Sequence, residues 1–345
     1  MPDATPASQA AQPQNSRSVQ ALESELEERR LAGDAAAVGE ICMRLGEAYA
    51  ARGSLRSALT VFEEALKTFE EGENRGGRLQ CLKSLAGLCY REGAWDRALD
   101  LYHQALALLA AAEEQAEIAL THSQIGSVYQ GQGDWEKALA AYRRSLEIRQ
   151  HLGDTRGMAL LYNNLGAVFA RQERWEEARQ AWGECLALHE GTGEVTGQAI
   201  TLGNLGSLAQ RQGQWADALT WYERSLPLYR KSGDVVGEAT IHNNIGFVHK
   251  QVGRLDQAVA AYQEGLKLLH RIGDSLRATV AMYNMAIVHE DQGNYREALR
   301  LLGQVIEMDR RIGHPDLRRD METFRRVRQK LDAGRDEKRM QEERA

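Results

Sequence analysis

The sequence predicts an all-α fold, a right-handed α-solenoid built from two-helix (helix-turn-helix) repeats. The main observation is a period of forty residues along most of the 345-residue chain. One position of the repeat always holds a small residue, and these residues are Gly46, Ala86, Gly126, Gly166, Gly206, Gly246 and Ala286. Twelve residues later the repeat always holds alanine, at Ala58, Ala98, Ala138, Ala178, Ala218, Ala258 and Ala298. Such self-similarity is typical of a solenoid, in which each repeat buries its apolar face against its neighbours.

The segment before the repeats is expected to have two parts. Residues 1–16 are rich in Ala, Pro, Gln and Ser, and they lack the apolar stretch of a secretory signal, so we expect a disordered tail. In residues 17–33, Leu22 and Leu26 lie on one helical face, and Leu22 falls forty residues before Phe62. We therefore expect an N-terminal capping helix that covers the apolar end of the first repeat.

Residues 34–313 are expected to form seven repeats, each with a helix A and a helix B. In the fourth repeat, helix A would span residues 155–171 and helix B residues 175–190. Glycines follow helix B, where the left-handed conformation is cheapest for glycine; they are Gly33, Gly153, Gly193, Gly233, Gly273 and Gly313. Aspartates that can cap the next helix A come directly afterwards, and they are Asp34, Asp154, Asp234 and Asp274. Other glycines mark the turn from helix A to helix B, at Gly53, Gly93, Gly133, Gly213, Gly253 and Gly293.

Three places depart from this regular pattern. Glu173 stands where the other repeats have a turn glycine, so its turn requires another solution. Residues 108–113 contain no glycine, which predicts either a longer continuous helix or a different superhelical step there. Pro227 lies inside a helix B, where we expect a kink or an early helix end.

The small residues indicate where helix A and helix B of one repeat cross. We expect a close crossing there, because a larger side chain would push the two helices apart. Aromatic residues begin most of the B helices, and we expect them to fill the opposite sides of the same contact; examples are Trp95, Trp135, Trp175, Trp215 and Tyr295.

The chain after the repeats is also expected to have two parts. Residues 314–333 carry an apolar stripe that includes Phe324 and Val327, and Arg325 stands where a repeat would have Gly or Ala. Because no second helix could pack tightly on Arg325, we expect a single C-terminal capping helix. Residues 334–345 are almost wholly polar, and we expect them to form a frayed tail.

The motif around Tyr162, Gly166, Ala178 and Trp182 resembles the tetratricopeptide repeat (TPR), with its aromatic, Leu-Gly, alanine and second aromatic. The forty-residue period is similar to the longer repeats of Pins-type scaffolds, kinesin light chain and bacterial TPR regulators. The resemblance runs over residues 34–313. It implies the fold, but not the partner, because this family binds very different partners.

Composition argues against several other functions. A net charge of −6 does not favour a protein that binds nucleic acid through its phosphates. No apolar run has the length of a membrane span, and we expect a cytoplasmic protein. No CxxC pair occurs among the four cysteines, so neither a zinc site nor a disulfide framework is indicated; they are Cys42, Cys81, Cys89 and Cys185.

No constellation of residues indicates catalysis. His249 and His289 occupy the slot of Phe169 in consecutive repeats, but the further ligands that a metal site needs are missing. The glycines at Gly191 and Gly193 lie between two helices rather than after a strand, so they are no dinucleotide fingerprint. We therefore expect no catalytic residue, no metal and no cofactor, and the protein is not expected to be an enzyme.

The resemblance implies that the A helices line a concave groove, and that the position two residues before the small residue points into it. This position reads Arg44, Ser84, Gln124, Asn164, Asn204, Asn244 and Asn284, and two of these asparagines are preceded by Asn163 and Asn243. An amide both donates and accepts hydrogen bonds, so a ladder of amides can pair with the backbone of an extended peptide. Helix propensity does not explain the asparagines.

Two interpretations of the amides stay open. Pins-type and related arrays hold extended peptides with asparagines at this position, which favours peptide binding. Those scaffolds often have a second asparagine three residues later, where this chain has Ala167, Ser207, Phe247 and Ile287. The alternative is that the amides tie each helix A to the backbone of the next repeat.

Basic residues gather on the same surface, at Arg44, Lys83, Arg91, Arg171, Arg211 and Lys250. In an acidic protein this distribution favours an acidic peptide. Acidic residues near both ends of the groove argue against it, at Glu40, Glu47, Glu290 and Asp291. The alternative is an ordinary solvated surface.

The sequence thus predicts a protein–protein interaction scaffold or adaptor that binds an extended, possibly acidic, peptide segment of a partner in the concave groove. One alternative is a regulatory protein that senses a peptide or small ligand, although such regulators usually carry an effector domain. Another is a self-assembling structural scaffold, which would make the protein a homo-oligomer. Neither nucleic acid nor a membrane is expected as a partner.

Overall fold

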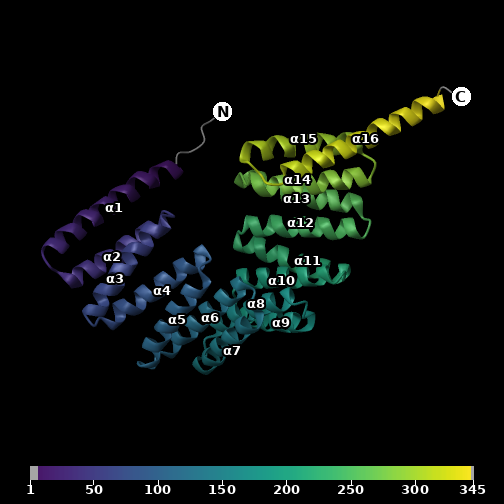
Figure 1. Ribbon diagram of the computed structural model, residues 1–345. Coiled ribbons are helices and arrows are strands. Elements are labelled where there is room, and N and C mark those ends of the chain that lie inside the picture. The colour runs from purple at the N-terminus through teal and green to yellow at the C-terminus, as the bar shows by residue number, and fades with distance from the viewer. Residues whose placement is uncertain (1–6, 343–345) are drawn as a thin grey trace. The chain divides into compact units, whose positions relative to one another are not determined.

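The structure is a computed structural model that describes the chain from residue 7 to residue 342. Sixteen helices and no strand occur within that range, which confirms the predicted all-α fold (Figure 1). The helices are α1 (Ala7–Leu31), α2 (Ala35–Ala51), α3 (Leu55–Glu71), α4 (Arg75–Glu92), α5 (Trp95–Ala110), α6 (Gln115–Gln132), α7 (Trp135–Leu152), α8 (Thr155–Arg171), α9 (Trp175–Thr192), α10 (Val195–Arg211), α11 (Trp215–Ser232), α12 (Val235–Gln251), α13 (Leu255–Ile272), α14 (Ser275–Asp291), α15 (Tyr295–Ile312) and α16 (Leu317–Glu342).

The chain forms two compact units, and the division between them falls within the sequence of α8. The N-terminal unit ends at Val168 and the C-terminal unit begins at Phe169. Successive helices contact one another in chain order from α1 to α7 and from α9 to α16. Consecutive A helices also contact each other where α2 meets α4, α10 meets α12 and α12 meets α14. This stacking of helix pairs is that of an α-solenoid.

The small residues mark a close crossing of helix A and helix B, as expected. A Cβ atom on Gly126 would lie 2.6 Å from the ring of Tyr142, and one on Gly206 would lie 2.5 Å from the ring of Tyr222. The ring that fills this contact comes from the residue four positions after the invariant alanine. The alanines themselves are fully buried.

The aromatic residues that begin the B helices contact the next repeat as well as their own. Within its own repeat, the ring of Trp95 lies edge to face with that of Tyr90 in α4, with the centroids 5.4 Å apart. A Cβ on Gly131 of α6 would lie 3.0 Å from the ring of Trp95, the first residue of α5. The rings of Trp215 in α11 and Phe247 in α12 lie edge to face, with their centroids 6.4 Å apart. The first turn of a helix B is adjacent to the following helix A, which explains this contact.

Three turns that lack glycine at the left-handed position adopt the same backbone conformation as the turns that have it there. Glu73, Glu113 and Glu173 adopt the left-handed conformation, with φ of 52°, 56° and 60°. Residues 108–113 therefore do not form a continuous helix, because α5 ends at Ala110 and Glu113 adopts the left-handed conformation that glycine adopts in other turns. A non-glycine residue in this conformation costs about 1 kcal/mol or more, and the two flanking helices impose it.

Two further expectations concern the ends of helices. The four aspartates cap their helices: the side chains of Asp154, Asp234 and Asp274, for example, accept the amide N–H three residues later at 2.8–3.0 Å. Pro227 does not end its helix early, since α11 continues through Ser232. Pro227 lies on the exposed side of α11. Proline has no backbone N–H to donate to the carbonyl group four residues earlier, and on this side water can bond to that carbonyl instead.

Single helices flank the repeats at both ends. Helix α1 buries Val19 and Leu26, but it begins at Ala7, inside the segment expected to be a disordered tail. Alanines are strong helix formers, and extending an existing helix is easier than nucleating one, which accounts for the earlier start. Helix α16 buries Val327 and continues to Glu342, beyond the expected boundary at residue 333. Residues 1–6 and 343–345 of the two expected tails lie outside the described residues.

Candidate functional site

The predicted amides lie on the exposed side of the A helices, and each of them is half-buried. In the C-terminal unit they are Asn204 on α10, Asn243 and Asn244 on α12, and Asn284 on α14; in the N-terminal unit Gln124 is on α6 and Asn163 and Asn164 are on α8. We call the surface that these amides form in each unit the amide face of that unit. An apolar residue and a small residue follow Gln124, Asn164, Asn204, Asn244 and Asn284, and both are buried, so they anchor the helix while the amide remains at the surface.

The amides of neighbouring repeats make hydrogen bonds to side chains. The Nδ2 group of Asn284 donates to Oδ1 of Asn243 at 3.1 Å, which links α14 to α12. Burial raises the pKa of the Tyr222 hydroxyl, and hydrogen bonds with Ser207 and Asn244 oppose that rise. Each amide offers two N–H donors and a two-lone-pair oxygen, so one such bond leaves capacity for a ligand.

Exposed apolar side chains lie one helical turn before the amides, a feature that the sequence interpretation missed. Leu160, Ile200 and Val280 are 52%, 43% and 43% exposed. Each precedes an asparagine by four residues, at Asn164, Asn204 and Asn284, so both lie on the same face of their helix. The same forty-residue period that revealed the asparagines would have revealed these residues.

Small cavities open between successive A helices at equivalent places in the two units. In the C-terminal unit a cavity of about 180 Å³ lies between α12 and α14, where Asn243 and Thr240 meet Val280 and Ala281. In the N-terminal unit one of about 450 Å³ lies between α4 and α6, beside Lys83 and Glu117. Each cavity can hold a small side chain beside a hydrogen-bonding group.

Most of the predicted basic residues already interact with other residues of the chain. Lys83 pairs with Glu117, Lys250 with Asp291 at 3.5 Å, and Arg44 with Glu25 at 3.7 Å. The guanidinium group of Arg211 lies 5.2 Å from the centre of the Trp175 ring and donates to the carbonyl oxygen of Ala170 at 3.3 Å. These partners reduce the positive charge that the surface presents.

Arg91 and Arg171 differ from the other basic residues. Both are exposed, and neither forms an ion pair with any residue whose side chain the structure describes. On α6, Oε1 of Gln124 is buried and has no hydrogen-bond partner among the described residues.

The structure provides no setting for metal or thiol chemistry in the part of the chain that it describes. There, no group of three or more His, Cys, Asp or Glu side chains could hold a metal ion. Burial raises the pKa of Cys42 and of Cys81 to about 12, which leaves both thiols protonated and unreactive at neutral pH. Nδ1 of His289 lies 3.0 Å from Oε1 of Gln292, so this histidine has a local structural partner.

None of the helices between residues 7 and 342 is both long and apolar enough to span a membrane.

The stacked helix pairs define an α-solenoid repeat protein. The TPR family model, described as "Tetratricopeptide repeat", matches residues 39–111, 117–180, 157–231 and 237–311. These matches cover most of the chain, which therefore belongs to the tetratricopeptide repeat family. Proteins of this kind typically mediate protein–protein interactions.

Solved structures with the same fold come from several kinds of protein. BtubC (BKLC) from P. vanneervenii is 24% identical with a TM-score of 0.54, over 64% of this chain and 92% of that one. Aspartyl phosphate phosphatase F from Bacillus subtilis is 12% identical with a TM-score of 0.62, over 96% of both chains. A STAND protein with a tetratricopeptide repeat sensor, PH0952 from Pyrococcus horikoshii, is 15% identical with a TM-score of 0.65, over 91% of this chain and 48% of that one. Identities this low show a shared fold alone. No curated protein sequence matches the chain.

Proposed function

We propose that the protein is an interaction scaffold that binds an extended peptide segment of a partner protein along the amide face of one unit. The observation that carries the proposal is the pairing of an exposed apolar residue with an amide on the same helical face. This pairing occurs at Leu160 with Asn164, at Ile200 with Asn204 and at Val280 with Asn284. The equivalent place before Asn244 holds the exposed Thr240 instead.

An extended peptide matches this alternation. Its backbone N–H and C=O groups can pair with the amides, and its apolar side chains can contact Ile200 and Val280 or enter the cavity beside Asn243. Acidic residues of a segment bound to the C-terminal unit would be recognised by Arg171, and those of one bound to the N-terminal unit by Arg91, since the other predicted basic residues have partners within the chain. We expect the apolar and amide contacts to contribute more to affinity than these exposed charges, because exposed ion pairs contribute little.

Peptides selected against the whole protein from a library of unconstrained sequences provide the test, with affinity measured by fluorescence anisotropy. The double change Asn204→Ala/Asn244→Ala should weaken binding about ten-fold or more, since two hydrogen bonds of about 0.5–1.5 kcal/mol are lost. The change Gln180→Ala/Gln263→Ala removes two exposed amides from B helices and is the matched control.

A second variant separates binding from folding, because Asn244 also bonds to Tyr222. Ile200→Ser/Val280→Ser alters exposed side chains only, so the melting temperature should stay the same while peptide affinity falls. Equal affinities of this variant and of the wild type would show that the ligand does not lie on the amide face of the C-terminal unit.

A further inference from the structure

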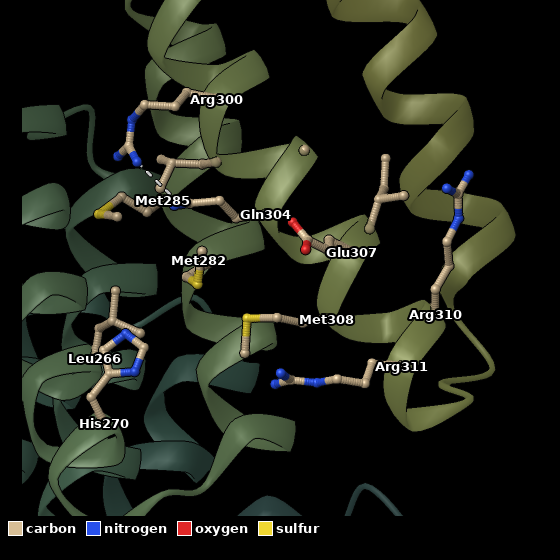
Figure 2. A pocket seen from close by; sticks show the side chains of 13 residues that line it. Leu266, His270, Met282, Met285, Arg300, Gln304, Glu307, Met308, Arg310 and Arg311 are labelled. Atoms are coloured by element: carbon tan, nitrogen blue, oxygen red, sulfur yellow. Dashed lines mark hydrogen bonds between the residues drawn. The ribbon is translucent and has the colours of Figure 1, made fainter. Parts of the chain in front are cut away.

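A second binding surface lies between the B helices of the last two repeats. A groove with a volume of about 1030 Å³ separates α13 from α15, and α14 forms its floor (Figure 2). Its lining includes none of the amides described above. The groove is therefore distinct from the amide face of the C-terminal unit.

Methionines dominate the apolar part of this groove. Met282 and Met285 of α14 are about 5% exposed and form the floor, and the half-buried Leu266 and Met308 form the walls. Figure 2 shows Met282, Met285 and Met308 in the middle, with Leu266 on the side of α13. Methionine side chains are flexible and polarisable, so they adapt to an apolar partner.

Gly303 keeps the mouth of the groove open. A Cβ atom built on Gly303 would meet no atom within 4 Å, so packing does not require glycine there. Most other repeats have a long side chain at this position, namely Glu63, His103, Arg143, Glu223 and Gln263. Gly183 of the fourth repeat is the exception, and its Cβ would likewise meet open space.

The rim of the groove is basic, although the protein carries a net charge of −6. Arg300 lies near one end of the α15 wall and Arg311 near the other, eleven residues later, which corresponds to about 16 Å along a helix. Arg300 forms an ion pair with Glu297, one turn earlier on α15, which reduces the charge that it presents. Arg311 has no acidic partner among the residues whose side chains are described, so the attraction of this rim for acidic residues rests mainly on Arg311. Glu307 is the one acidic residue in the lining.

We propose that this groove binds an acidic amphipathic helix of a partner protein. Three turns of helix match the distance from Arg300 to Arg311. Apolar residues spaced by three and four positions would lie over Met282, Met285 and Met308, and acidic residues near its two ends would lie close to the two arginines. A helix held between two neighbouring helices buries one apolar stripe and leaves its other faces in water.

The test is a selection of 14-residue helical peptides by the full-length protein. The library varies the apolar stripe and places either acidic or basic residues on the other faces. Peptides are selected on the wild type and counter-selected on Gly303→Trp, which fills the groove. Gly183→Trp is the matched control, since it adds the same side chain at the equivalent place of another repeat.

We expect recovered peptides to be acidic and to carry apolar residues at helical spacing. Their affinity should fall at least ten-fold in Gly303→Trp and remain within two-fold in Gly183→Trp. Arg300→Glu/Arg311→Glu should weaken binding by a similar factor while the melting temperature stays constant, and added salt should weaken wild-type binding.

Three results would overturn the proposal. One is the recovery of no peptide that prefers the wild type to Gly303→Trp. Another is the recovery of basic or non-helical peptides. The third is a wild-type dimer in sedimentation that Gly303→Trp dissociates, since this would assign the groove to a second copy of the chain.

Discussion

The helices that flank the repeats, α1 and α16, cover opposite ends of the repeat series with different chemistry. Helix α1 buries the apolar side chains of Val19 and Leu26 and places its charges at the surface, as in the bidentate pair of Arg30 with Glu64. Helix α16 buries Val327 and also covers charged residues, of which Glu290 is 6% exposed. The first contact should be insensitive to pH, and the second should depend on it.

The polar groups beneath α16 come from three helices. Glu290 of α14 accepts hydrogen bonds from Arg326 at 2.7 Å and from Lys330 at 2.8 Å. Burial would raise the pKa of Glu290, but these two cations outweigh it and hold the pKa below its usual value. Asp309 of α15 and Asp320 of α16, each 1% exposed, form a carboxyl pair.

The comparison is tested most strongly by removing a whole cap. Truncation after Gly313 should expose the apolar side of α15, including Val305, and should cause aggregation or a fall of many degrees in melting temperature. Deletion of residues 1–16 should have little effect, because Val19 and Leu26 remain. Thermal melts of both truncations provide the measurement, and equal melting temperatures would contradict the difference between the two deletions.

Removing the cations beneath α16 should have the next largest effect. The double change Arg326→Ala/Lys330→Ala leaves Glu290 charged and buried without its partners, which typically costs about 3–5 kcal/mol. Urea unfolding measures this cost. Restoring the wild-type stability by adding Glu290→Gln would show that the unpaired charge, rather than lost packing, is responsible.

The pH dependence of the C-terminal cap should come from Asp320. Burial, and then the hydrogen bond with Asp309, raise the pKa of Asp320 to about 6, against the opposing effect of Arg319. The other groups around the pair are Asp316, which pairs with Arg319, and Tyr283, whose ring Arg319 covers. Apart from the Asp320 carboxyl, the buried oxygens of Asp309 have no hydrogen-bond partner among the described residues.

A pKa raised by folding means that the protonated pair stabilises the fold at low pH and that this contribution is lost as the pH rises through about 6. The contribution of Asp320 to the free energy of unfolding should therefore fall by about 2–3 kcal/mol between pH 4.5 and pH 7.5. Burial lowers the pKa of His122, His189, His242 and His249, which opposes this fall in the total stability, so the contribution is measured as the difference between the wild type and Asp320→Asn. Asp320→Asn keeps a hydrogen-bond donor for Asp309 without the charge, so it should remove this fall. Chemical denaturation at several pH values measures the free energy of unfolding of both proteins. If this free energy depended on pH in the same way for the wild type and for Asp320→Asn, the prediction would be contradicted.

The smallest effect is expected at the N-terminal cap. Arg30→Ala breaks the contact with Glu64, but both side chains are at least one-third exposed, so the cost should be below about 1 kcal/mol. This change is the counterpart of Arg326→Ala in the other cap. If Arg30→Ala destabilised the protein as much as Arg326→Ala/Lys330→Ala does, the greater exposure of the Arg30–Glu64 pair would not explain a difference between the two caps.

Local features of the fold were predictable from the sequence. The aspartate caps at Asp234 and Asp274 use a backbone N–H three residues away, so spacing alone predicts them. The close crossing at Gly206 also follows from the period, because the same small residue must meet the same helix in every repeat. Glu113 was not predictable as a left-handed turn, since glutamate has no preference for that conformation and the two flanking helices impose it.

The candidate site was predictable only in part. The period identifies the asparagines on helix A, and it would also have identified Ile200 and Val280. It does not show which partners the side chains meet. Lys250 was interpreted as part of a basic patch, and the structure pairs it with Asp291, forty-one residues later.

The sequence by itself determined the repeat, its helix pairs and the residue types at each position, because these depend on spacings within one or two helices. Only the tertiary structure decided the contacts between repeats, among them Asn284 with Asn243 and Trp95 with the helix that follows it. It also decided that Asp309 and Asp320 meet in a buried place. These contacts depend on how far each helix is shifted and rotated against the next one, and that geometry results from the packing of all the side chains between them.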